Sequence, residues 1–215
     1  MSEEARLRER ICLLARSIFE RGMTSGASGN MSARLSDGNL LVTPTGSSFG
    51  FLDPARLSLV KPDGTLVSGD KPTKEMPLHS AFFETRSGCG AVVHLHSTHS
   101  VALSMLPETD PDNVLPPLTA YSVMRLGKVK LLPYFRPGDP AMGAAVRGLA
   151  GRRSAVLLAN HGPVVAGADL DAAFYAMEEL EEGARLALLT QGRNPRMLSQ
   201  GQIGELVRTF GVEWD

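Results

Sequence analysis

The sequence predicts a layered α/β fold around a sheet of mixed strand direction. Residues 23–75 are rich in Gly, Pro, Ser and Asp between short alternating runs, which is typical of antiparallel strands joined by tight turns. From residue 74 onward, helical patterns alternate with short apolar runs. Hairpins followed by helix–strand alternation favour one sheet with helices packed on it. Because there is no repeat and no linker, we expect a single domain over residues 1–215.

The first part of the chain should form a helix and then a β-meander. Apolar residues at three- and four-residue steps, among them Leu7, Ile11 and Ile18, predict an amphipathic helix over residues 2–22, which Gly22 ends. Tight turns are expected at Asp37-Gly38 and at Asp63-Gly64.

The remainder should alternate helices with buried strands. Residues 107–138 contain many prolines and are expected to be largely loop, with a possible strand at "VKLLPY". Strands are expected at "GAVVHLH" and "SAVLLAN". Helices are expected over residues 74–87, over 97–106 (opened by Ser97), from Asp139 to about 151, from the Asp169 cap to about 190, and over 199–211.

Composition excludes several classes of function. Lys and Arg total 22 and Asp and Glu total 23, so no charge excess or basic block indicates nucleic acid. The apolar runs are far shorter than the roughly 20 residues that cross a bilayer, and the charged N-terminus does not resemble a secretion signal. Cys12 and Cys89 form no disulfide framework, so a cytoplasmic location is expected.

Three of the five histidines lie in "GAVVHLHSTHS", residues 90–100. Side chains two residues apart on a strand share a face, so His94 and His96 can converge on one metal ion. The alternative is that both are polar residues on a solvent face. A second buried run ends in His161, which can supply a third nitrogen, as catalytic zinc sites use. Considered alone, His161 is better explained as a polar residue in a Gly-Pro turn.

One carboxylate is placed to join this group. Glu75 stands at the start of the helix before the histidine strand, where it can approach a metal or act as a base. An ordinary first-turn glutamate favoured by the helix dipole is the alternative. His79 lies four residues later on the same helix face, so pairing on the helix can explain it. His99 remains outside the expected ligand set.

Three segments of small residues offer anion-binding groups. They are "SGASGNMS" (25–32), "TPTGSS" (43–48) and "KPTKE" (71–75), the last with the charge of Lys74. Turns need the same residues, so each segment alone is weak evidence. None matches a phosphate-binding loop or a dinucleotide fingerprint, which makes a nucleotide ligand unexpected.

Five motifs in order resemble the class II aldolase and adducin family, which includes fuculose-phosphate aldolase and ribulose-phosphate 4-epimerase. They are "SGNMSAR", "LLVTPTG", "KPTKEMPLH", "AVVHLHSTHS" and "LLANHGPVVAG". The resemblance implies a three-layer α-β-α domain with a central mixed, largely antiparallel sheet. It also implies a cytoplasmic homotetramer with sites between subunits.

The same resemblance implies roles for residues. His94, His96 and His161 match ligands of a divalent metal, commonly zinc, with manganese or cobalt as alternatives. Glu75 matches the acid/base at the metal. The residues that match the family's phosphate-pocket positions are Asn30, Thr45, Gly46, Thr73 and Lys74. Here Thr73-Lys74 replaces the Ser-Ser that is typical of the aldolases.

Within the family, "PPLTAYSVMRLGKVKLLPYFRPGD" is most similar to the 3-oxo-tetronate 4-phosphate decarboxylases. That similarity implies release of carbon dioxide from a phosphorylated sugar acid, leaving dihydroxyacetone phosphate, with Tyr121 as proton donor. From spacing alone, Tyr121 is better explained as a packing aromatic. The alternatives are a sugar-phosphate aldolase or 4-epimerase with the same site, and a non-catalytic domain like the adducin heads, which lack the metal ligands.

Overall fold

The computed structural model describes residues 1–214. Its strands are β1 (Asn30–Arg34), β2 (Leu40–Val42), β3 (Ser58–Val60), β4 (Leu66–Ser68), β5 (Ala91–His94), β6 (Lys130–Leu132), β7 (Ala155–Leu158) and β8 (Gly162–Gly167). Its α-helices are α1 (Glu3–Glu20), α2 (Met76–Thr85), α3 (Thr98–Ser104), α4 (Ala120–Leu126), α5 (Ala141–Gly148), α6 (Leu170–Thr190) and α7 (Gln200–Phe210). Two short 3₁₀ turns, Phe49–Phe51 and Pro54–Arg56, join β2 to β3. Among residues 1–214, no helix is both long and apolar enough to cross a membrane.

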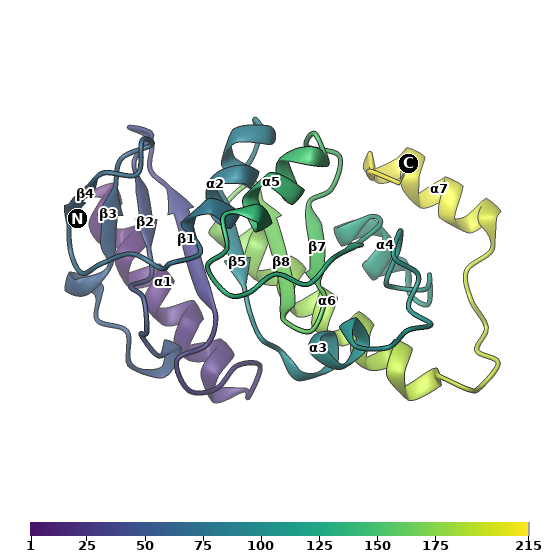
Figure 1. Ribbon diagram of the computed structural model, residues 1–215. Coiled ribbons are helices and arrows are strands. Elements are labelled where there is room, and N and C mark those ends of the chain that lie inside the picture. The colour runs from purple at the N-terminus through teal and green to yellow at the C-terminus, as the bar shows by residue number, and fades with distance from the viewer. Residues whose placement is uncertain (215) are drawn as a thin grey trace.

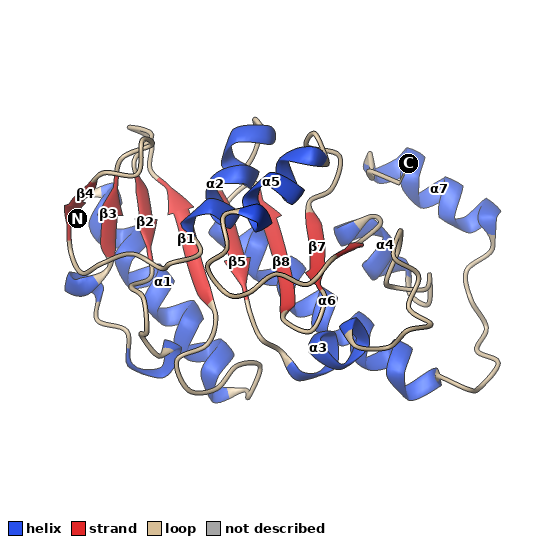
Figure 2. Ribbon diagram, viewed as in Figure 1, coloured by secondary structure: helices blue, strands red, loops and turns tan. Residues whose placement is uncertain are grey.

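The eight strands form one sheet in the order β4-β3-β2-β1-β5-β8-β7-β6 (Figure 2). Neighbouring strands are antiparallel except β6 and β7, which are parallel. The predicted meander is confirmed as β1 to β4. Its two predicted turns contain Gly38 and Gly64 at φ of 87° and 89°, a conformation that glycine adopts without strain.

Helices cover both faces of the sheet (Figure 1). Strand β5 illustrates this arrangement, because the side chains of successive strand residues point to opposite faces of the sheet. Val92 belongs to an apolar cluster with Phe82 of α2 and Met142 of α5. Val93 belongs to a second cluster with Ile11 of α1 and Met177 of α6. The predicted three-layer α-β-α architecture is therefore confirmed, and both faces of β5 are buried.

Two elements differ from the sequence prediction. β8 was not expected, because it begins with Gly162-Pro163, two residues that strands disfavour. Pro163 lies at the strand end, where its missing N–H removes few ladder bonds. The region expected to be largely loop contains α4, which Thr119 caps by accepting a hydrogen bond from the amide of Ser122. The possible strand in that region is confirmed as β6.

Candidate metal centre

The three predicted histidines meet at one place in the structure. His94 is the last residue of β5, His96 lies two residues beyond that strand, and His161 is in the turn between β7 and β8. The Nε2 atom of His96 lies 3.1 Å from the Nε2 of His94 and 3.1 Å from the Nε2 of His161. The strand was expected to reach His96 but ends at His94, and the imidazoles still converge.

The turn that carries His161 is held close to the exit of β5. A Cβ atom on Gly162 would lie 2.2 Å from the carbonyl oxygen of Leu95 and 3.3 Å from the Cα of His96. Only glycine permits this approach, and its φ of 155° disfavours other residues. The β7–β8 turn thus reaches the backbone between His94 and His96, which brings the third imidazole to the first two.

Hydrogen bonding and burial set the protonation of His94. Its Nδ1 lies 2.8 Å from the carbonyl oxygen of Pro163, which can only accept, so Nδ1 carries the proton and Nε2 keeps its lone pair. Burial lowers the pKa of His94 to about 3. Burial also lowers the pKa values of His96 and His161. The cluster is therefore neutral near pH 7, which is the form that binds metals.

Glu75 completes the group. It occupies the N-cap position of α2 and is 3% exposed. Its carboxylate oxygens lie 3.4 Å from Nε2 of His94 and 3.5 Å from Nε2 of His161. Burial acts to raise the pKa of Glu75. Attraction to the imidazoles, which become charged only when they are protonated at acid pH, and a 2.8 Å hydrogen bond from Nδ2 of Asn30 both act to lower it, and the net result is a lowered pKa. The carboxylate is ionised.

This arrangement fits a divalent metal ion. Three nitrogens held by a tetrahedral ion at about 2.0–2.1 Å lie about 3.3 Å apart, close to the spacing of the Nε2 atoms here. The ring centroids are 4.7–5.0 Å apart and the rings are steeply inclined to one another. Three converging lone pairs beside an ionised carboxylate repel one another unless a cation lies between them. His94, His96 and His161 form the group able to hold it.

A buried polar chain supports Glu75 from behind. The Oδ1 of Asn30 contacts Nε2 of His79, whose Nδ1 lies 2.6 Å from the hydroxyl of Ser32. His79 therefore reaches Glu75 through Asn30 rather than by direct pairing along the helix. Ser32 was missed in the sequence analysis, although alternation on β1 places it on the same face as Asn30. The amide of Asn30 is thus already engaged with two side chains.

The remaining anion-pocket candidates lie on two adjacent loops. Pro44 and Pro72 form an isolated bridge, and the amide of Thr45 donates to the carbonyl of Lys71 over 3.0 Å. Gly46 has a φ of 70°, and Thr73 accepts a 3.3 Å hydrogen bond from the amide of Glu75 through its hydroxyl. The two loops therefore run side by side and lead into Glu75. Lys74, the residue before Glu75, is exposed.

Tyr121 lies on a different part of the molecule. It is in the first turn of α4, 59% exposed, with the guanidinium of Arg125 5.8 Å from its ring centroid. Figure 1 shows α4 beyond β7 and beside α7. The histidines instead lie at the end of β5 and in the turn before β8. His99 also stands outside the cluster, since its Nδ1 lies 2.8 Å from Glu181.

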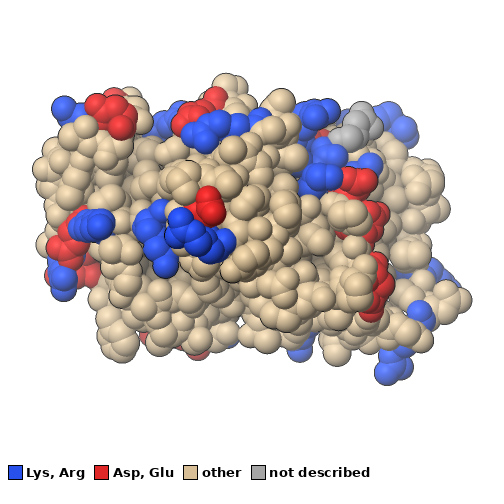
Figure 3. Space-filling model, viewed as in Figure 1, with Lys and Arg blue, Asp and Glu red and all other residues tan. Residues whose placement is uncertain are grey.

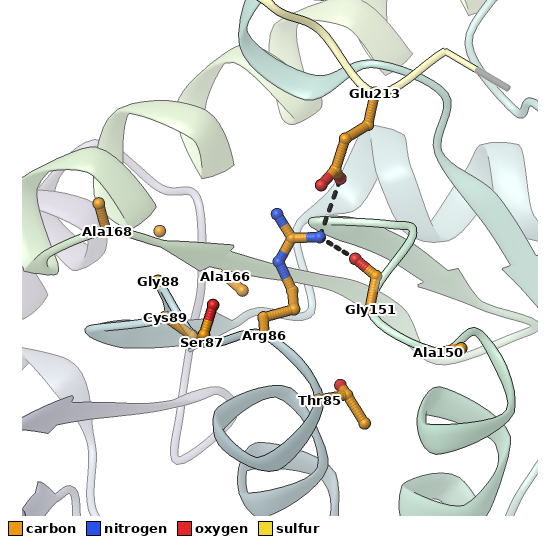
Figure 4. A pocket seen from close by; sticks show the side chains of 11 residues that line it. Thr85, Arg86, Ser87, Gly88, Cys89, Ala150, Gly151, Ala166, Ala168 and Glu213 are labelled. Atoms are coloured by element: carbon orange, nitrogen blue, oxygen red, sulfur yellow. Dashed lines mark hydrogen bonds and ion pairs between the residues drawn. The ribbon is translucent and has the colours of Figure 1, made fainter.

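A large hollow of about 410 Å³ lies at the opposite end of β5, between Cys89 and Gly167 (Figure 4). Its one cationic side chain, Arg86, donates to the carboxylate of Glu213 over 2.8 Å and to the carbonyl of Gly151. Because that charge is neutralised within the chain, the hollow offers no free group for an anion.

Comparison with known proteins agrees with the site. Residues 9–188 match the model of the class II aldolase and adducin N-terminal domain. The chain belongs to the class II aldolase and adducin family. The class II aldolases of this family are metal-dependent, and the three-histidine group described above is able to hold such a metal.

The relatives include decarboxylases, which are more similar to this chain, and aldolases, which are less similar. A 3-oxo-tetronate 4-phosphate decarboxylase of Escherichia coli strain K12 is 52% identical over 94% of this chain and 96% of its own. An L-fuculose phosphate aldolase of Methanococcus maripaludis is 33% identical over 80% of this chain and 91% of its own. The crystal structure of YgbL from Escherichia coli superposes with a TM-score of 0.93 at 50% identity, covering 95% of this chain and 99% of that one.

Proposed function

We propose that this protein is a metal-dependent lyase that decarboxylates 3-oxo-tetronate 4-phosphate to dihydroxyacetone phosphate and carbon dioxide. The observation that carries the proposal is the convergence of three neutral imidazoles with an ionised, buried Glu75. The 52% identity to a decarboxylase over nearly the whole chain supports the substrate class. The adducin-like alternative is disfavoured, because all four of these residues are present.

His94, His96 and His161 would hold the metal, with zinc the best match to a neutral three-nitrogen set and manganese or cobalt as alternatives. When bound, a divalent ion acts as a Lewis acid toward the ketone and the neighbouring hydroxyl of the substrate. The hydrogen bond from His94 to Pro163 fixes that imidazole in the orientation that a ligand needs.

Glu75 is proposed as the acid/base. Its carboxylate is held by Asn30 and can accept the proton of the substrate C2 hydroxyl. The substrate is a β-keto acid, so when the C1–C2 bond breaks, carbon dioxide leaves and the electron pair moves toward the C3 carbonyl oxygen. Atom C2 then takes a proton from Glu75 or from Tyr121, the oxygen on C2 regains its proton, and water reprotonates the donor, so that one proton is consumed for each carbon dioxide released. Thr45, Gly46, Thr73 and Lys74 are proposed to bind the phosphate, beside Asn30.

We further propose a cytoplasmic homotetramer in which residues 1–215 form one domain. The exposure of Tyr121 supports this assembly, because the hydroxyl of an exposed tyrosine on α4 reaches a centre at β5 most simply in a neighbouring copy. The substrate would be a small phosphorylated sugar acid.

Product analysis tests the proposal against the aldolase or 4-epimerase alternative, which the 33% identity to an L-fuculose phosphate aldolase keeps open. Metal-loaded protein is given 3-oxo-tetronate 4-phosphate or fuculose 1-phosphate in separate reactions. We expect carbon dioxide and dihydroxyacetone phosphate from the first and no aldehyde from the second. Aldehyde release without carbon dioxide would show that the protein is an aldolase.

The Glu75→Gln variant tests whether Glu75 is the acid/base. The amide is nearly isosteric and leaves the three imidazoles in place, so the variant should keep most of its metal while turnover falls by at least about a hundred-fold. Wild-type rates in this variant would remove Glu75 from the mechanism.

A further inference from the structure

We propose that His79 is a positioning residue for Glu75, and that it acts by fixing the side-chain amide of Asn30. This inference rests on the proposed function, in which Glu75 is the acid/base. It gives a task to a buried histidine that neither the metal site nor the proposed reaction uses.

The side chains of Ser32, His79 and Asn30 form a buried chain that ends at Glu75. Ser32 and Asn30 lie two residues apart on β1 and so point to the same face of the sheet, opposite Val92 and His94 of β5. Ser32 and His79 are fully buried. The space-filling view of the face that α2 covers agrees with this, because side chains close over the sheet there (Figure 3). Water therefore cannot replace the bonds of this chain.

The ionised carboxylate of Glu75 determines the direction of every bond in the chain. A carboxylate only accepts, so the atom of Asn30 that lies 2.8 Å from Oε2 of Glu75 is the amide nitrogen. The amide oxygen then faces Nε2 of His79, and because that oxygen also only accepts, Nε2 carries the proton. Nδ1 keeps its lone pair and accepts from the hydroxyl of Ser32 over 2.6 Å. Each member thus donates toward Glu75.

His79 holds Asn30 as a neutral imidazole. Burial lowers the pKa of His79 to about 4, so the ring carries a single ring N–H proton near pH 7. With that proton on Nε2, only one orientation of the Asn30 amide is compatible with both neighbours. A flipped amide would set two acceptors against each other at Glu75 and two donors against each other at His79. The imidazole therefore keeps the N–H groups of Asn30 on the side of the carboxylate.

Glu75 gains a fixed orientation from this arrangement. Asn30 holds its Oε2, and its Oε1 lies 3.5 Å from Nε2 of His161, at the centre where the substrate is proposed to react. Misplacing a catalytic group by about 1 Å costs up to about a hundred-fold in rate. Loss of the bond from His79 should therefore lower kcat, while KM and metal content stay nearly unchanged.

Two polar replacements of His79 separate positioning from lost polarity. The amide nitrogen of His79→Gln is as many bonds from the backbone as Nε2 and still donates to Asn30, whereas the shorter amide of His79→Asn ends at the position of Nδ1. For release of carbon dioxide, we expect kcat to fall at least about ten-fold in His79→Asn and less than about three-fold in His79→Gln, with KM within about two-fold of wild type. Equal values of kcat in the two variants, or a raised KM with wild-type kcat, would overturn the inference.

A control and a double variant test the route through Asn30. Phe82→Leu is the control for lost packing, because Phe82 is buried in the apolar cluster on the same helix; it should lower stability to urea and leave kcat unchanged. Once Asn30→Ala has removed the amide, adding His79→Asn should lower kcat no further. A further fall as large as that of His79→Asn alone would show that His79 acts by another route, contrary to the inference.

Exchange of the side-chain amide protons of Asn30, followed by NMR, needs no substrate. These protons should exchange slowly with solvent in wild-type protein and in His79→Gln, and faster in His79→Asn. If wild-type protein releases no carbon dioxide but exchange follows this order, the proposed reaction fails and the control of Asn30 by His79 stands. Equal exchange in all three proteins would overturn the inference, whatever reaction the protein catalyses.

Discussion

At the scale of single residues, the site depends on groups that hold the histidines and Glu75 in position. The carbonyl of Pro163 fixes the tautomer of His94, and Asn30 orients the carboxylate of Glu75. Such outer contacts fix ring orientation and raise the basicity of the ligating nitrogen. The three imidazoles should therefore act as one unit, in which each is needed for tight metal binding.

Removing one imidazole tests this unit. His161→Ala should purify with well under one metal ion per chain and bind added zinc at least about a hundred-fold more weakly, because two nitrogens and a carboxylate replace a three-nitrogen set. Elemental analysis and competition with a chelator measure both quantities. His99→Ala is the control and should retain its metal, since His99 contacts Glu181 instead. Full metal occupancy in His161→Ala would contradict the assignment.

Gly162 is a second residue on which both stability and metal binding should depend. In Gly162→Ala, the new methyl group would meet the carbonyl of Leu95 at 2.2 Å, so the turn must move away from β5. We expect a loss of stability of about 2–4 kcal/mol together with weaker metal binding, measured by urea unfolding and chelator competition. Gly148→Ala on α5, where a Cβ meets nothing within 4 Å, is the control; it should leave metal binding unchanged and should not lower stability, since alanine favours a helix by up to about 1 kcal/mol over glycine. Wild-type metal affinity in Gly162→Ala would show that the turn does not position His161.

Much of the candidate site was visible in the sequence because its residues sit at element ends. His94, His96, His161 and Glu75 each stand where a predicted strand or helix begins or ends. The link from His79 to Glu75 through Asn30 could not be predicted, because it joins a helix to a strand through side chains whose contact depends on packing.

At the scale of elements, α3 shows how a buried charge can replace a local cap. Ser97 occupies the predicted N-cap position, but its side chain makes no capping hydrogen bond. The carboxylate of Glu181, on α6, instead accepts from the amides of His99 and Ser100 and from the hydroxyl of Ser100. α6 thereby anchors the segment that follows His96 directly.

Glu181→Gln should destabilise the protein by about 2–3 kcal/mol near neutral pH, because a buried charged acceptor of several hydrogen bonds is lost. Burial acts to raise the pKa of Glu181, but the hydrogen bonds outweigh it and the pKa is lowered. Its contribution is therefore full above the ordinary carboxyl range and is lost as the pH falls through the lowered value. Urea unfolding of both proteins from neutral to acid pH should show the difference shrinking toward acid. A constant difference would exclude the charge as its source.

Helices and strands were predicted correctly where the local sequence pattern determines them. They were missed where contacts with the rest of the fold determine them. The meander was readable from alternation and from the Asp-Gly turns. β8 was not, because its pairing with both β5 and β7 overrides the poor strand propensity of Gly162-Pro163. α4 was hidden by the prolines around it, although it has the Thr119 cap and buries Val123 and Leu126.

At the scale of the whole molecule, one chain holds the three histidines and Glu75 together but leaves Tyr121 exposed on α4. If a neighbouring copy supplies Tyr121, each site draws Glu75 from one chain and Tyr121 from another. Two different inactive variants then complement each other, because closed symmetric assembly of mixed chains creates some sites with both residues intact.

Mixing tests this arrangement directly. Glu75→Gln and Tyr121→Phe should each be nearly inactive alone. After the two are dissociated and reassembled together in equal amounts, random assembly leaves about one quarter of the sites with both residues, so about a quarter of wild-type activity should return. Native mass spectrometry, with one variant carrying a tag that adds mass, establishes that mixed tetramers have formed. If those tetramers show no more activity than the two separate variants, Tyr121 does not act in a neighbour's site, and its role as proton donor fails with it.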